Sequence, residues 1–246
     1  ALSEGNLRGA VAHITTAAVG RENDPSVLEA LCASLCQLGE IEMALGVANS
    51  PELAQCSDAE VLAGIAARLC DQSLPEYAFP LLQRAQALGL DDARLHYLSG
   101  LCQLYLGELD VAGRAFERCL ERAPYHAACH RQVSRLRRMT QQHNHVDRLR
   151  RVLDKLGDAH PEAPPIHFAL FKELDDLEET LGAWTALQAG MRTRRRQIDY
   201  QPDIEAHLFD LLRHMPADGM TGPHSQSDGA TPIFIIGQPR SGTTLL

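Results

Sequence analysis

The chain has 246 residues, of which 45% are hydrophobic and 5% aromatic, and its formal net charge at pH 7 is −9. This length fits one or two domains, and the negative charge gives no general case for nucleic-acid binding. No apolar run approaches the roughly 18–20 residues that a transmembrane helix needs. The low aromatic content fits an Ala/Leu-rich helical chain. We therefore expect a helical protein, with neither a membrane span nor a nucleic-acid partner.

The N-terminus and the cysteines favour a cytoplasmic protein. The sequence begins at Ala1 without the basic-then-apolar pattern of a signal peptide, so we expect a start that is truncated or processed. Seven cysteines, an odd number, are scattered along helical patterns as reduced thiols would be. They are Cys32, Cys36, Cys56, Cys70, Cys102, Cys119 and Cys129. Cys32 and Cys36 lack a paired histidine nearby, so we predict no metal site.

The sequence repeats with a period of 34 residues. Ala44, Ala78 and Ala112 are 34 residues apart, and Gly39, Ser73 and Gly107 each lie five residues before one of them. A period of this length is typical of stacked helix–turn–helix units. The alanines would let the second helix of a pair approach the first closely, and the residue five positions earlier would close the turn.

The clearest unit, residues 93–126, resembles the tetratricopeptide repeat (TPR). The matching residues are Gly100, Gly107, Ala112, Phe116, Cys119 and Pro124. The unit departs from the pattern at Ser99, where leucine is usual, and at Gln103, where tyrosine is usual. The resemblance implies a mainly α fold, a TPR α-solenoid of antiparallel helix pairs whose concave side binds partners.

In this frame the repeat array occupies residues 1–197. The predicted repeats are 1–22 (partial), 25–58, 59–92, 93–126, 127–160 (degenerate, with Val146 in place of the alanine) and 164–197. Pro80 falls inside a second helix, which it should kink or delay. Residues 198–231 are predicted to hold a helix from Asp203, its N-cap, to His214, followed by a Gly/Ser/Pro-rich linker.

Three histidines, His96, His130 and His167, occupy the repeat position at which TPRs usually carry tryptophan. One interpretation makes them a column of ligands. The other places a flat, half-polar ring at each helix–helix seam. We favour the second, because successive repeats hold these rings too far apart to share one ion.

A basic segment supplies candidate residues for binding a partner. Residues 114–151 contain ten arginines and three acidic residues. Within a helix expected over 127–141, Arg131, Arg135 and Arg138 share one face that would point to the concave side. They could clamp an acidic protein, peptide or polyanionic acceptor, or they could form a solvated face or a dock for another domain of the chain. The run 192–196 is interpreted as a solvated helix end.

The last stretch, 232–246, predicts a phosphate-binding loop. Ile233 to Ile236 form a short β-branched run typical of a buried parallel strand. Gly237 and Gly242 have the spacing of a P-loop, and a helix would begin after them. Thr243 replaces the P-loop lysine, and Arg240 supplies the fixed cation instead, which argues against an ordinary ATPase or GTPase.

This stretch resembles the 5′-phosphosulfate loop of sulfotransferases that use 3′-phosphoadenosine 5′-phosphosulfate (PAPS). The matching segment reads Phe-Ile-Ile-Gly-Gln-Pro-Arg-Ser-Gly-Thr-Thr-Leu-Leu. By this resemblance the 5′-phosphate would be held by Arg240, Ser241, Gly242, Thr243 and Thr244, as the start of an α/β P-loop-like domain. The whole chain then resembles the bacterial TPR-containing sulfotransferases.

The resemblance implies sulfuryl transfer from PAPS to a hydroxyl or amine, without a metal. The catalytic base would lie beyond Leu246, so we expect the chain to be an inactive fragment of an enzyme, and the acceptor stays open. Two alternatives remain. The chain could be a TPR adaptor without catalytic activity, or a P-loop kinase-like transferase.

Overall fold

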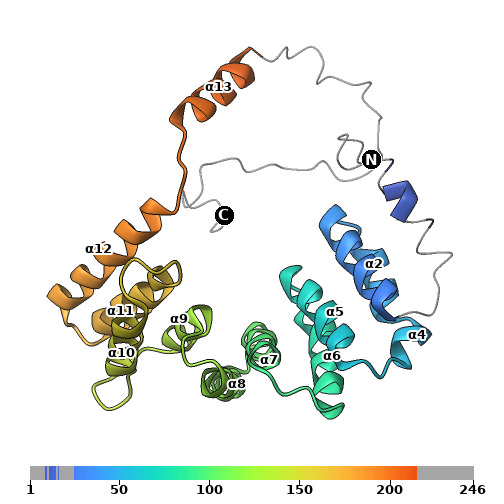
Figure 1. Cartoon of the computed structure of the whole chain (residues 1–246), viewed down its shortest axis with the longest axis horizontal. Helices are drawn as coiled ribbons and strands as arrows, with labels where there is room; N and C mark the ends of the chain where they lie inside the picture. The colour runs from blue at the N-terminus through green and yellow to red at the C-terminus, as the bar shows by residue number, and fades with distance from the viewer. Residues whose placement is uncertain (1–8, 10, 15, 17–24, 215–246) are drawn as a thin grey trace, which may run out of the picture. The chain divides into compact units, whose positions relative to one another are not determined.

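The computed structural model describes residue 9, residues 11–14, residue 16 and residues 25–214 (Figure 1). Their regular structure is helical, apart from one isolated β-bridge between Thr140 and His143. This confirms the mainly α fold predicted for the repeat array. The strand and loop predicted at 232–246 lie outside the described residues.

Twelve helices, α2 to α13, cover most of the described chain. Their bounds are α2 Pro25–Leu38, α3 Ile41–Ala48, α4 Pro51–Ala54, α5 Ala59–Asp71, α6 Pro75–Ala87, α7 Ala93–Tyr105, α8 Leu109–Arg122, α9 Ala127–Arg135, α10 Val146–Leu156, α11 Ala163–Asp176, α12 Thr180–Arg196 and α13 Pro202–Arg213. The chain forms two compact units, Ala1–Ile198 and Asp199–Leu246. Helices α2 to α12 belong to the first unit and α13 to the second.

Within the first unit, helices that follow each other in sequence pack as pairs. α2 packs on α3, α5 on α6, α7 on α8, and α11 on α12. The first helices of neighbouring pairs also lie side by side, because α2 contacts α5, α5 contacts α7, and α9 contacts α11. One pair cannot bury its own apolar faces, so each is completed by its neighbour, as in other helical repeats.

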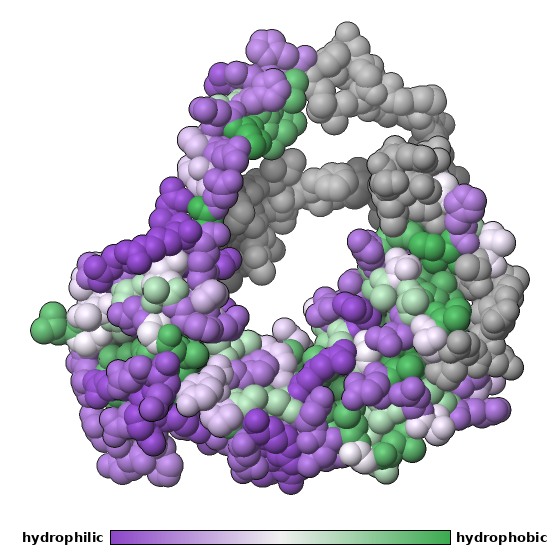
Figure 2. Space-filling view, in the orientation of Figure 1, coloured by the Kyte–Doolittle hydropathy of each residue, from purple (hydrophilic) through white to green (hydrophobic). Residues whose placement is uncertain are grey.

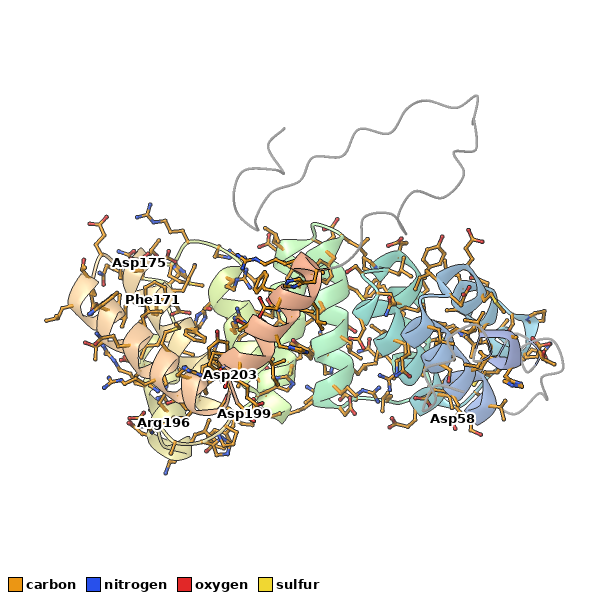
Figure 3. All side chains as sticks on the ribbon, turned by 90° about the horizontal axis from the view of Figure 1, so that it is seen from above. Asp58, Phe171, Asp175, Arg196, Asp199 and Asp203 are labelled. Atoms are coloured by element: carbon orange, nitrogen blue, oxygen red, sulfur yellow. The ribbon has the colours of Figure 1, made fainter. Side chains whose placement is uncertain are left out.

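The N-terminus of the first helix is capped at the same repeat position in three units. Asp58 before α5, Asp92 before α7 and His126 before α9 are 34 residues apart. Asp58, labelled in Figure 3, accepts hydrogen bonds from the backbone N–H groups of Glu60 and Val61 at 3.0 and 3.3 Å. These side chains satisfy donors that have no partner inside the helix.

The turn inside each pair is also fixed by one repeat position. Gly39, Ser73, Gly107 and Glu178 have φ between 60° and 85°, the left-handed conformation that favours glycine. After Gly107, the N–H of Glu108 donates to the carbonyl of Gln103 at 2.8 Å, and equivalent bonds follow the other three residues. This pattern closes the first helix and reverses the chain toward the second.

Small residues let the helices of a pair approach closely. Ala44, Ala78 and Ala112 are completely buried, as the repeat frame requires. A Cβ atom added to Gly100 would lie 2.5 Å from Cε1 of Phe116, a ring that is itself fully buried. Burial of such a ring contributes roughly 1.5–3 kcal/mol, so this contact anchors α7 to α8.

Two sequence predictions about helix limits are corrected by the structure. α6 begins at Pro75 and continues through Pro80, so Pro80 does not delay it. α13 begins at Pro202 with Gln201 at the N-cap position, and Asp203 lies in its first turn instead. Proline is favoured at the first helical position because its missing N–H has no partner there in any case.

Helix α13 presents an exposed apolar stripe within its own unit. Ile204, Leu208, Leu211 and Leu212 are each more than half exposed. Figure 2 shows the hydrophobic residues of α13 gathered on one side of the helix. The helix predicted in this region is therefore present, and the described residues of this unit leave its apolar stripe uncovered.

Replacement of Gly100 by alanine tests the close contact. Alanine favours a helix over glycine by about 1 kcal/mol, but overpacking against Phe116 costs about 1–3 kcal/mol. We expect Gly100→Ala to lower the free energy of unfolding in urea by up to about 2 kcal/mol. Gly46→Ala is the control, because Gly46 is exposed in α3 with open space around its Cβ position, and it should gain up to about 1 kcal/mol. Equal effects at the two sites would contradict the packing argument.

Candidate functional site

The residues predicted to hold the 5′-phosphate of PAPS are Arg240, Ser241, Gly242, Thr243 and Thr244. All five lie outside the described residues, so the loop stays a prediction from the sequence. The described residues predicted to bind a partner are the three arginines of the basic segment.

Arg131 and Arg135 lie on α9, one turn apart, and both side chains are exposed. Neither guanidinium forms an ion pair or a hydrogen bond with another described residue. Arg138 does not share their helix, because α9 ends at Arg135 rather than continuing to residue 141. The prediction of one helix face for all three arginines is therefore wrong for Arg138.

The early end of α9 has a cause in a distant part of the sequence. In the segment 136–145, the N–H of Met139 donates to a carboxylate oxygen of Asp176 at 2.7 Å. Lys172 donates to the carbonyl of Arg137 at 2.5 Å and is also bonded to Asp176. Side chains of α11 thus occupy backbone groups that a longer α9 would bond internally.

Arg138 instead lies near Glu178, with 3.8 Å between the charged atoms. Their side chains are 73% and 86% exposed. An ion pair of this kind contributes little, since water and salt screen it. Arg138 is consequently a surface residue of the irregular segment outside α9, although it lines one pocket together with Arg135.

An apolar stripe on α7, beside α9, was not predicted from the sequence. Tyr97, Leu101 and Leu104 are half-buried against the cluster formed by α7, α8 and α9, and Tyr105 is 60% exposed. These residues do not occupy any of the positions that define a TPR. The signal that could have found them is their spacing, because Tyr97, Leu101, Leu104 and Tyr105 recur at helical intervals.

Tyr97 connects this stripe to α9. Its ring centroid lies 4.7 Å from that of His126 and 6.0 Å from that of Phe116. Burial raises the pKa of Tyr97, while a hydrogen bond with Gln132 of α9 opposes the shift. The tyrosine therefore stays neutral and fixes the edge of α7 against the start of α9.

We call the resulting region the α7–α9 surface. It comprises Tyr97, Leu101, Leu104, Tyr105, Arg131 and Arg135. It combines half-buried apolar groups with two exposed cations on adjacent first helices. Aromatic residues and arginine are the types most enriched at protein–protein contacts, so the composition suits a partner.

A partly buried polar network joins α8, α10 and α11. Arg148 of α10 binds both carboxylate oxygens of Glu117 on α8, at 2.6 and 3.0 Å. His145 donates its backbone N–H to Glu173 of α11 at 2.5 Å, and its Nδ1 lies 2.9 Å from the same carboxylate. Burial works against ionisation of Glu117, but the hydrogen bonds and charge of Arg148 lower its pKa. The ion pair of Arg148 with Glu117 thus joins α10 to α8, and the hydrogen bonds of His145 with Glu173 join the start of α10 to α11.

The three histidines of the repeat position lie at helix seams and do not form a column of ligands. Each is at least 95% buried, and each imidazole contacts the segment before its own helix. Nε2 of His96 lies 2.6 Å from Asp91, that of His130 lies 2.8 Å from the carbonyl of Pro124, and that of His167 lies 3.3 Å from Asp158. Burial lowers the pKa of His130 and His167, so both are neutral at pH 7.

The cysteines serve as core residues. All seven are free and buried, and burial raises the pKa of the Cys32 thiol to about 12. A thiol of such high pKa is a poor nucleophile. No group of three or more His, Cys, Asp or Glu residues in the described part of the chain could hold a metal ion. The same part contains no helix that is both long and apolar enough to cross a membrane.

Comparison with solved structures identifies the fold. A crystal structure of MamA protein matches with a TM-score of 0.55 and 11% identity, covering 72% of this chain and 95% of that one. The structure of YrrB, described as a TPR protein with an unusual peptide-binding site, matches with a TM-score of 0.53 and 15% identity over 79% of this chain and 97% of that one. No protein-family model and no curated protein matches the sequence. The chain thus has a TPR fold, as predicted.

The polar network can be tested at Glu173, its buried member. We expect Glu173→Ala to lower the free energy of unfolding by about 2–4 kcal/mol, because two donors of His145 lose their acceptor inside the protein. Glu178→Ala, which removes the exposed partner of Arg138, should change it by less than about 0.5 kcal/mol. Urea unfolding followed by circular dichroism measures both. A Glu173 variant as stable as the Glu178 variant would show that the network does not support the fold.

Proposed function

We propose that the chain binds a protein or peptide partner on the α7–α9 surface. The observation that carries this proposal is the pairing of a half-buried apolar stripe with two exposed arginines that have no partner among the described residues. The first helices of a TPR array form its usual binding face. The partner would place apolar side chains against Leu101 and Leu104 and acidic side chains beside Arg131 and Arg135.

The positive charge of this region favours an acidic partner. Residues 114–151 contain ten arginines and three acidic residues within a chain of net charge −9. A local positive region on a negative protein attracts acidic segments and accelerates their association. The apolar stripe would supply most of the affinity, since exposed ion pairs contribute little alone.

The comparisons support a peptide partner only through the fold. YrrB is described as having an unusual peptide-binding site, so an array of this fold can carry one. For this chain the proposed site rests on its own residues. A cytoplasmic location is part of the proposal, because seven buried free thiols suit a reducing compartment.

A fluorescent peptide of alternating leucine and glutamate tests the surface. We expect Arg131→Glu combined with Arg135→Glu to weaken its binding at least tenfold, or about 1.4 kcal/mol, and added salt to weaken binding to the unaltered protein. Arg194→Glu with Arg196→Glu is the control, because it makes the same charge change in the last turn of α12. Equal losses of peptide affinity in the two double variants would show a general effect of charge and would reject the α7–α9 surface as the binding site.

A second candidate function rests on the segment 232–246. Its Pro-Arg-Ser-Gly-Thr-Thr sequence after a β-branched run favours a loop that holds the 5′-phosphosulfate of PAPS. We propose that the protein encoded by the whole gene transfers a sulfuryl group to a hydroxyl or amine. Arg240 and the N–H groups of 241–244 would hold the phosphate, and the TPR array would bring the acceptor or a partner protein.

Binding of 3′,5′-ADP tests this candidate. In the protein made from the whole gene, 3′,5′-ADP should raise Tm, because a ligand of the folded state stabilises it. Arg240→Ala should abolish the increase, whereas Arg213→Ala, a change in α13, should leave it intact. Protection by ATP with Mg²⁺ in place of 3′,5′-ADP would instead favour a kinase-like transferase. No effect of either nucleotide would favour an adaptor without catalytic activity.

A further inference from the structure

A cavity of about 500 Å³ lies between α8, the start of α9 and α10. Its lining includes His130 and Arg148, together with the apolar Leu120, Pro124, Tyr125 and Val152. Cavities of this volume commonly hold small molecules or single side chains. Two polar atoms in its lining residues are buried without a partner.

The first of these atoms is Nδ1 of His130. The imidazole is almost completely buried, and its Nε2 donates a proton to the carbonyl of Pro124 at 2.8 Å. Because burial lowers the pKa of His130, the ring is neutral at pH 7 and carries its one proton on Nε2. Nδ1 is then an acceptor, and it has no partner among the described residues.

The second atom is Nε of Arg148. Both terminal nitrogens of this guanidinium bind the carboxylate of Glu117, so its charge is already compensated. The Nε–H group is buried and has no acceptor in the described structure. Buried polar groups without partners are uncommon, and each costs about 1–3 kcal/mol. His130 and Arg148, which line the cavity, thus hold one unpartnered acceptor and one unpartnered donor with no net charge between them, and a ligand would reach these buried atoms after a shift of the side chains.

The rest of the lining also favours an uncharged ligand. Leu120 and Val152 are buried and apolar. The formal charges of the other lining residues cancel, since Glu121 and Asp154 are matched in number by Arg151 and Lys155. A carboxylate would meet the lone pair of His130, and an ammonium would meet Arg148. A single hydroxyl matches both groups, since it can donate to Nδ1 and accept from Nε–H.

We propose that this cavity binds a phenol hydroxyl, most simply the tyrosine side chain of a partner protein. The ring would lie against Leu120 and Val152, and the hydroxyl would join His130 to Arg148. A phenol is a stronger hydrogen-bond donor than an aliphatic alcohol, which suits a neutral imidazole acceptor. The inference does not depend on the α7–α9 surface, because Arg131 and Arg135 are not among the residues that line the cavity.

Two matched compounds test the proposal on the whole 246-residue chain. N-acetyl-tyrosine amide should bind at least tenfold more tightly than N-acetyl-phenylalanine amide, because the second lacks the hydroxyl and leaves both polar atoms unpaired. Nitrogen NMR should show a shift of Nδ1 of His130 on binding of the tyrosine compound and not of the phenylalanine compound. Equal affinities, or shifts confined to other histidines, would overturn the proposal and leave a cavity filled by water only.

A variant provides an independent check. Val152→Phe fills the cavity and should abolish binding of N-acetyl-tyrosine amide, while the double charge reversal at Arg131 and Arg135 should leave it unchanged. If Val152→Phe prevents folding, the comparison of the two amides on the unaltered protein still decides the question. Loss of tyrosine binding in the charge-reversal variant would place the site on the α7–α9 surface and reject the cavity.

Discussion

The close approach of paired helices is the constraint on which the rest of the structure depends. Gly100 and the buried alanines allow it, and Phe116 fills the space that Gly100 leaves. If a larger side chain separated α7 from α8, the seams on both sides of the pair would change together, because each helix also packs on a neighbouring pair. The positive-φ residue at each turn, such as Gly107, serves the same constraint by bringing the second helix back along the first.

The unit formed by α9 and α10 departs from this plan, and both proposed sites in the described chain include residues of α9. α9 is 9 residues long where α7 has 13, so the segment 136–145 replaces further helical turns. Glu173 and Asp176 bind backbone N–H groups of that segment. Polar bonds thus substitute for regular helix packing here, and the cavity lined by His130 opens beside the same irregular unit.

How much could be predicted from the sequence depended on how far apart the interacting residues are. The 34-residue spacing of Ala44, Ala78 and Ala112 predicted a TPR fold, because each repeat encodes its own turn and close contact. The end of α9 could not be predicted, because its cause is Asp176, 37 residues after Met139. The stripe that begins at Tyr97 was not predicted, because the positions that define a TPR are not the outward-facing positions that this stripe occupies. The cavity could not be predicted at all, since unpaired atoms are visible only in three dimensions.

Adjacent residues of α9 face two different environments, so one short helix contributes to both of the proposed sites. Arg131 is exposed and keeps its charge available to a partner, whereas His130 is buried and neutral. The polar bonds of Glu117 and Glu173 restrict the helices around both residues before any partner arrives. Because less freedom is then lost on binding, modest contacts can give useful affinity.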